Sequence, residues 1–336
     1  MAEPSQQRGV VVPAGEAAAP APRARRRAVR LQGRRIGDRL YVIGTTAAAV
    51  AVPLMLLTIA LIIGVAAWPA LHRFGLGFLT SSDWDPVAER YGVAPAIYGT
   101  LVSSFLALLI ATPLAVGASV FLTEYAPAWV RRPVAFLIDL LAAIPSVIFG
   151  LWAIFVLLPI LRGTVIPFLR DTLHLGATPF FSGPAYGPSM LAAALILAIM
   201  ILPYIAAVSR EVLLAVPRSQ REAALALGAT QWEMVRGAVI PFARSGIIGG
   251  VILGLGRALG ETMAVTMVIG NRQEISASLL APGYTLASVI ANQFAEATSN
   301  LQLSALMAAG FVLFVVTLLV NAGARWLVWR TARIGA

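Results

Sequence analysis

The stretch from Val216 to Gly246 reads VPRSQREAALALGATQWEMVRGAVIPFARSG. It is too polar to cross a membrane and too apolar to be a plain linker. Strong helix formers fill positions 221–227, and Gly228, which follows them, suits the left-handed residue that often ends a helix. Thr230 can then cap a second helix that runs toward Pro241. We therefore predict two short helices that are separated at Gly228.

These two helices should present an apolar surface. We expect five apolar side chains to project from a compact cytoplasmic knob, namely Leu225, Leu227, Trp232, Met234 and Val235. The alternative is a re-entrant or interfacial helix whose apolar face lies among lipid headgroups.

Apolar segments dominate the chain on both sides of this stretch. Hydrophobic residues make up 59% of the 336 positions and charged residues 12%, whereas soluble domains have about 45–50% and about 25%. A membrane-spanning helix needs roughly 20 apolar residues. Six segments meet that length: 41–68, 96–123, 134–160, 189–214, 246–270 and 303–328. The sequence therefore predicts an all-α integral membrane protein with six transmembrane helices.

The N-terminal segment differs from the rest of the chain. Residues 1–40 are rich in Pro, Ala and Arg, so they cannot bury enough apolar surface to fold alone. We predict a disordered, arginine-rich cytoplasmic arm at 1–40 and a six-helix domain at 41–333.

Arginine placement predicts the orientation in the membrane, because cytoplasmic flanks carry the excess of positive charge. With an internal N-terminus, 19 arginines fall on the inside and five on the outside. Both termini should therefore be cytoplasmic. The longest internal connection, 210–245, then lies on the side where ATP is available.

Residue types that are missing exclude several kinds of chemistry. The chain has no cysteine, and its two histidines, His72 and His174, lie apart between apolar segments. An HExxH metalloenzyme and thiolate metal sites are thus excluded. All 25 basic residues are arginine, so the chain lacks the lysine of a Walker A loop. We expect no cofactor, no metal and no catalytic residue, and a separate subunit must hydrolyse any ATP.

Two charged residues, Arg257 and Glu261, fall inside the fifth apolar segment. A charge at the centre of a membrane helix costs about 2.5–3.5 kcal/mol on insertion scales. A helix over 246–270 would place both residues on one face, in line with Gly250 and Gly254. This face should point into the bundle.

Two interpretations of this pair stay open. One is a structural ion pair. The other is a substrate path, because the planar fork of Arg257 matches an oxyanion. Glu261 would then orient Arg257 or accept a hydrogen bond from a protonated phosphate oxygen, which sulfate does not have.

The loop carries a recognisable motif. Glu222, Ala223 and Ala224, with Gly228 and Pro241 at the right spacing, resemble the E-A-A-x3-G-x9-I-x-L-P loop of type I ABC importer permeases. Two positions depart from the pattern, Ala238 and Ile240. The resemblance implies that the segment 216–245 forms coupling helices that sit in a cleft of an ATPase subunit.

Three further segments narrow the family. The sequence GLGRALGETMAV at 254–265 resembles phosphate-specific permease subunits of the PstC family, and 143–152 and 281–292 agree. The sister family PstA generally has Ala-Pro where this chain has Met263 and Ala264. The resemblance covers about 40–330, and the type I core would lie at about 94–328.

The resemblance also implies partners and a mechanism. The chain would supply half of a phosphate pathway in a bacterial cell membrane, beside a PstA-like subunit, two copies of a PstB-like ATPase and a PstS-like phosphate-binding protein. It would contact membrane lipid and no nucleic acid. Other possibilities are a sulfate or molybdate permease, a secondary transporter that uses Glu261 as a proton carrier, and a membrane protein of phosphate sensing.

Overall fold

The structure is a computed structural model that describes residues 34–184 and 186–334. The chain forms two units, residues 1–55 and 56–336. The first is described only from Arg34, where helix α1 (Arg34–Phe74) begins. The predicted arm thus lies outside the described residues up to position 33, and its last seven positions, expected to be disordered, are helical. They continue the apolar helix that follows.

Helices make up nearly all of the remaining elements. Those that cross or flank the membrane are α3 (Ala94–Val120), η1 (Phe121–Tyr125), α4 (Ala128–Ala142), α5 (Ser146–Trp152), η2 (Ala153–Leu157), α6 (Leu158–Ile160), η3 (Leu161–Val165), η4 (Phe168–Thr172), α7 (Met190–Leu214), α10 (Ile240–Leu259) and α13 (Asn300–Ile334). Shorter elements are α2 (Gly77–Thr80), β1 (Trp84–Asp85), β2 (Arg90–Tyr91), η5 (Leu175–Ala177), α8 (Arg218–Ala226), α9 (Gln231–Met234), η6 (Val235–Val239), α11 (Met263–Val268) and α12 (Leu286–Gln293).

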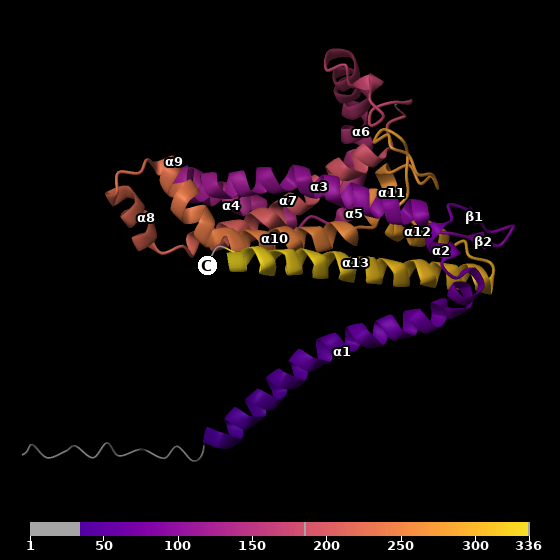
Figure 1. Cartoon of the computed structure of the whole chain (residues 1–336), viewed down its shortest axis with the longest axis horizontal. Coiled ribbons are helices and arrows are strands. Elements are labelled where there is room, and N and C mark those ends of the chain that lie inside the picture. The colour runs from indigo at the N-terminus through magenta and orange to yellow at the C-terminus, as the bar shows by residue number, and fades with distance from the viewer. Residues whose placement is uncertain (1–33, 185, 335–336) are drawn as a thin grey trace, which may run out of the picture. The chain divides into compact units, whose positions relative to one another are not determined.

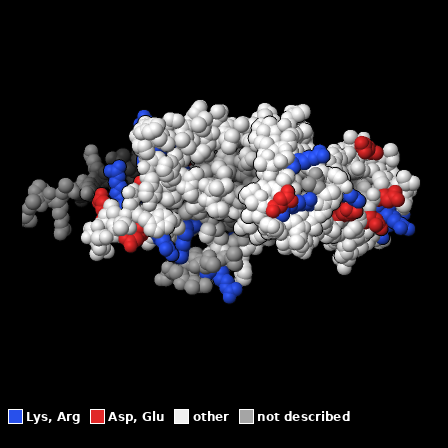
Figure 2. All heavy atoms as spheres, turned by 90° about the horizontal axis from the view of Figure 1, so that it is seen from above, with Lys and Arg blue, Asp and Glu red and all other residues white. Residues whose placement is uncertain are grey.

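Six membrane-spanning helices were expected, and the described residues contain six helices that are long and apolar enough to cross a membrane. Their bounds are Gly37–Phe74, Ala94–Tyr125, Ser146–Thr172, Met190–Leu214, Gln231–Leu259 and Asn300–Arg330. The face of the molecule shown in Figure 2 agrees with a membrane-spanning bundle. Its charged side chains gather toward the two ends and leave an uncharged zone between them. The predicted fold class is confirmed.

Helix α7 lies at the centre of the bundle. Its first turn is capped by Ser189, whose hydroxyl accepts the N–H of Ala192 at 3.3 Å, and a long apolar run follows. Helices α3, α7, α10 and α13 run side by side (Figure 1). The short elements α8 and α9 lie at one end of these helices, and the β1–β2 hairpin and α12 lie at the other. The hairpin pairs Trp84 with Tyr91.

Small residues allow these helices to approach closely, as membrane bundles require. A Cβ atom at Gly250 would lie 3.1 Å from Val208, and one at Gly254 would lie 2.8 Å from Ile205. Both neighbours belong to α7. The predicted glycine stripe therefore does face a packed helix.

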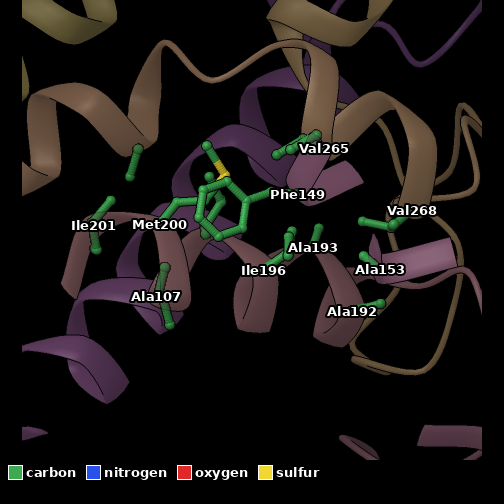
Figure 3. Close-up of a cluster of buried hydrophobic side chains, with 14 of the residues drawn as sticks. Ala107, Phe149, Ala153, Ala192, Ala193, Ile196, Met200, Ile201, Val265 and Val268 are labelled. Carbon is green, nitrogen blue, oxygen red and sulfur yellow. The ribbon is translucent and has the colours of Figure 1, made fainter. Parts of the chain in front are cut away.

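The largest buried cluster joins α3, α5, α7 and α11. Phe149 and Met200 lie at its centre, surrounded by small and branched residues such as Ala107, Ala193 and Val265 (Figure 3). This packing holds α11 against α5 and α7. The connection between α10 and α11 is thereby kept in one place.

The third span differs from the prediction of one helix over 134–160. The helix α4 ends at Ala142, and a new helix begins at Ser146, directly after Pro145. Proline lacks a backbone N–H and disfavours helical geometry at the residue before it. The span is therefore 146–172, and α4, which has no buried residue, is a separate amphipathic helix.

Candidate functional site

The fifth span also ends earlier than predicted. The helix α10 stops at Leu259, and α11 begins only at Met263. The N–H of Glu261 bonds to the carbonyl of Ala258 at 3.4 Å, which closes a tight final turn. The carboxylate of Glu261 accepts the N–H of Ala264 at 3.3 Å, so it bonds to the first turn of the next helix. The prediction that Arg257 and Glu261 share one helix face is therefore wrong.

Arg257 lies in the last turn of α10, and its guanidinium stacks on an aromatic ring. Its central carbon is 4.4 Å from the ring centroid of Tyr204 on α7. The hydroxyl of Tyr204 donates to the carbonyl of Ala142 at 2.8 Å, which holds the ring in position. The Nε atom of Arg257 is buried without a hydrogen-bond partner. Among the described residues, no ion pair joins Arg257 to Glu261.

A groove of about 880 Å³ opens beside Arg257, mainly between α10 and α13. Its lining contains two arginines and no carboxylate. The lining residues are Leu56, Tyr204, Gly249, Ile252, Leu253, Gly256, Arg257, Phe314, Thr317, Leu318, Asn321, Ala322 and Arg325. A positively charged groove with polar groups on an otherwise apolar wall suits a small anion.

The predicted coupling loop folds as expected around its glycine. The helix α8 covers Arg218–Ala226, and Gly228 has a φ of +86°, which favours glycine. Thr230 then forms a reciprocal capping box with Glu233. The second helix does not stop near Pro241, because α9, η6 and α10 continue as one rod from Gln231 to Leu259. Pro241 lies inside this rod just after the π-helical segment η6, where the regular i→i−4 hydrogen bonds are already interrupted.

Only part of the predicted apolar knob is exposed. Leu225, Leu227 and Trp232 are exposed, and Leu227 reaches 90% of its maximum. Met234 and Val235 were expected to project as well, but they are buried with residues such as Leu213, because the helix from Thr230 turns that face toward α7. Of the motif residues, Glu222, Ala223 and Gly228 are exposed, and Ala224 is half-buried.

A buried ion pair anchors α8 to the membrane-spanning helices. The guanidinium of Arg221 donates to both carboxylate oxygens of Glu124, at 2.8 Å and 3.1 Å. It also donates to the carbonyls of Leu213 and Val216, at 2.8 Å and 2.5 Å. The Glu124 side chain is 6% exposed. We call this pair the Glu124–Arg221 clamp.

Sequence reasoning missed four of these residues. Glu124 is an isolated carboxylate at the end of an apolar segment that faces an arginine-rich loop, which is a signal that could have been used. Tyr204, Asn321 and Arg325 carry no comparable signal, because their proximity to Arg257 depends on how α7, α10 and α13 pack.

Comparisons with known proteins agree with this architecture. Residues 111–333 match the family "Binding-protein-dependent transport system inner membrane component". The chain is 48% identical over 302 residues to the "Phosphate transport system permease protein PstC" of Mesorhizobium japonicum, covering 89% of this chain and 92% of that protein. It is 47% identical over 300 residues to the protein of the same name from Xylella fastidiosa, covering 88% and 92%.

A solved structure supports the fold. The chain resembles a bacterial ABC transporter involved in the import of the acidic polysaccharide alginate, with a TM-score of 0.55 at 16% identity, over 89% of this chain and 99% of the other. At that identity the likeness concerns the fold alone, which is that of an ABC importer permease. The chain belongs to the binding-protein-dependent inner membrane transport components and, within them, to the PstC family of permease proteins.

Proposed function

We propose that this chain forms half of the transmembrane pathway of an ATP-driven importer of inorganic phosphate. Its partners would be a PstA-like permease subunit, a PstB-like ATPase dimer that hydrolyses the ATP, and a PstS-like phosphate-binding protein. The observation that carries the proposal is Arg257, whose guanidinium stacks on Tyr204 beside a groove lined by no carboxylate. Similarity to phosphate permease proteins over nearly nine tenths of the chain supports the substrate.

Arg257 would bind the passing anion directly. Stacking on Tyr204 leaves the N–H groups at the edge of the guanidinium plane for a bidentate contact with two phosphate oxygens. Glu261 would act at the end of the same path by accepting a hydrogen bond from a protonated oxygen. Its carboxylate contacts the start of α11, and the described residues contain no ion pair between it and Arg257, which supports this role over that of orienting Arg257.

The loop 216–245 would transmit the movement of the ATPase. Glu222, Ala223, Ala224 and Gly228 lie on or after α8, whose outer face carries exposed apolar residues suited to a protein cleft. Pro241 lies on the rod Gln231–Leu259, where this rod enters the bundle. With both termini cytoplasmic, as the arginine distribution predicts, α8 and α9 would face the ATPase.

Uptake of labelled phosphate by the reconstituted four-component complex tests this function. Uptake should require ATP and persist when the proton gradient is collapsed. An excess of sulfate or molybdate should inhibit phosphate uptake only weakly. Dependence on the proton gradient instead of ATP would favour a secondary transporter. Preferential uptake of sulfate or molybdate would leave the ATP-driven importer standing and would refute phosphate as its substrate.

Coupling is tested with two loop variants. Glu222→Lys and Gly228→Asp should leave the protein in the membrane but reduce phosphate-stimulated ATP hydrolysis, because they alter the exposed surface and the positive-φ turn. Wild-type stimulation in both would refute the role of the loop.

A further inference from the structure

The groove beside Arg257 extends to a second arginine that has no assigned role. Arg325 lies on α13 and lines the same groove. Asn321 lies one helical turn before it on that helix, about 6 Å along the axis. The amide of Asn321 is also close to the arginine end of α10, since a Cβ atom at Gly256 would be 3.8 Å from it. Asn321 thus lies along the groove between the two arginines.

The charge in this groove is not neutralised from within it. Among its lining residues none is Asp or Glu, and within the described residues Arg325 takes part in no ion pair. Among the described residues, ion pairs are formed by Arg73, Arg210, Arg221 and Arg272, none of which lines this groove. A groove whose lining holds two guanidinium groups and no carboxylate favours the binding of an anion.

We propose that Arg325 and Asn321 form a second oxyanion-binding station, which receives the tetrahedral anion from Arg257 and passes it toward the cytoplasmic end of the pathway. This proposal rests on the proposed function and extends it by a further binding site. Transport through a pore requires several binding steps of moderate strength, because a single strong site would retain the ion. Two stations along one groove satisfy that requirement.

Asn321 has the chemistry for a transfer step. Its Nδ2 atom donates to the carbonyl of Thr317 at 2.9 Å, which orients the amide. A side-chain amide has two N–H donors and a carbonyl acceptor. The second N–H can bond to an anionic phosphate oxygen, and the carbonyl can accept from a protonated one. Arg325 supplies the charge, and Asn321 supplies polar groups that do not hold the anion strongly.

The facing side of α10 leaves room for this path. Gly249 and Gly256 both line the groove, and a Cβ atom at Gly249 would have no neighbour within 4 Å. A larger side chain there would fill the path without breaking an existing contact. Gly249→Leu should therefore reduce uptake while the complex still assembles.

The main test compares two arginines on α13. Arg325→Gln should lower the maximal rate of phosphate uptake about tenfold or more, with the KM for external phosphate changed less than about twofold, because capture precedes this station. Arg330→Gln is the matched control. It removes the same charge five residues further along, where Arg330 lies over Trp326 at 5.5 Å, outside the groove lining. The control should keep uptake within about twofold of wild type.

A second variant decides the matter if Arg325→Gln does not assemble. Asn321→Asp keeps both arginines and the size of the side chain but places a carboxylate in the groove, so it should reduce uptake by repulsion. Wild-type uptake by the assembled Asn321→Asp complex would refute the proposal that Asn321 and Arg325 bind the anion.

The outcomes separate this proposal from the one on which it rests. Normal uptake by Arg325→Gln, with uptake abolished in Arg257→Gln, would overturn the second station and leave the phosphate pathway standing. Normal uptake in both would overturn the whole path along this groove. A wild-type complex that transports no phosphate would overturn the proposed function itself.

Discussion

At the scale of single residues, the environment of Arg257 bears on the two interpretations of the charges in the fifth span. The arginine is stabilised by the face of Tyr204, and Glu261 bonds to the backbone of α11. A charge inside a membrane-spanning helix that has no ion-pair partner among the described residues is costly, so the presence of Arg257 favours a role in binding. The two residues should therefore respond differently to neutralisation.

Arg257→Gln should abolish phosphate uptake while the subunit still assembles, because the bidentate fork is lost. Glu261→Gln keeps the size of the side chain and should impair uptake less, or change the preference for phosphate over sulfate. The Arg257→Gln/Glu261→Gln double variant should remain inactive. Membrane abundance and uptake measured side by side check this; recovery of uptake in the double variant would instead indicate a structural ion pair.

Tyr204 should contribute by orienting Arg257. Tyr204→Leu removes a cation–π contact of about 0.5–2 kcal/mol, so uptake should fall about two- to thirtyfold. Tyr204→Phe keeps the ring and loses only the hydrogen bond to Ala142, so it should stay within about threefold of wild type. Initial uptake rates in vesicles measure both, and equal rates for the two variants would show that the ring is not needed.

At the scale of elements, the Glu124–Arg221 clamp holds α8 against the end of the second span. Gln231, which begins α9, donates to the carbonyl of Glu124 at 2.8 Å. Both short helices of the loop are therefore attached to the same point of η1. A force on α8 is transmitted to the bundle through these bonds as well as along the chain.

Glu124→Gln should destabilise the protein, because it leaves Arg221 mostly buried without its partner. Breaking such a pair from one side costs about 3–5 kcal/mol. The Glu124→Gln/Arg221→Gln double variant should recover part of the loss. Arg218→Gln, an exposed change at the start of the same helix, serves as the control. Abundance and thermal unfolding in detergent measure the effect; unchanged stability of Glu124→Gln would mean that the clamp contributes little.

At the scale of the whole molecule, one helical rod joins the loop 216–245 to the groove beside Arg257. The span Gln231–Leu259 has 29 residues, which corresponds to about 43 Å at 1.5 Å per residue. Thr230 caps one end, and Arg257 lies in the last turn at the other. A tilt imposed by the ATPase on α9 would therefore move Arg257 against α13 and its groove.

The N-terminal arm should be dispensable for transport. Deleting residues 2–33 leaves α1 intact, since it begins at Arg34, and removes a segment outside the family match at 111–333. Its arginines would at most add attraction to anionic lipid. Uptake should stay within about twofold of wild type when normalised to membrane abundance. A collapse of uptake with normal insertion would show that the arm has a function in transport.

Local patterns along the chain were enough to predict six spans, the turn at Gly228, the cap at Thr230 and the family. Hydrophobic length, capping residues and motif spacing are properties of neighbouring residues, so they can be read without a fold. The break after Leu259 and the stacking of Arg257 on Tyr204 could not be predicted in that way, and for the Glu124–Arg221 clamp the sequence signals Glu124 but not its pairing with Arg221. The clamp joins residues 97 positions apart, and such pairs depend on how the helices pack, which small residues and prolines decide in three dimensions.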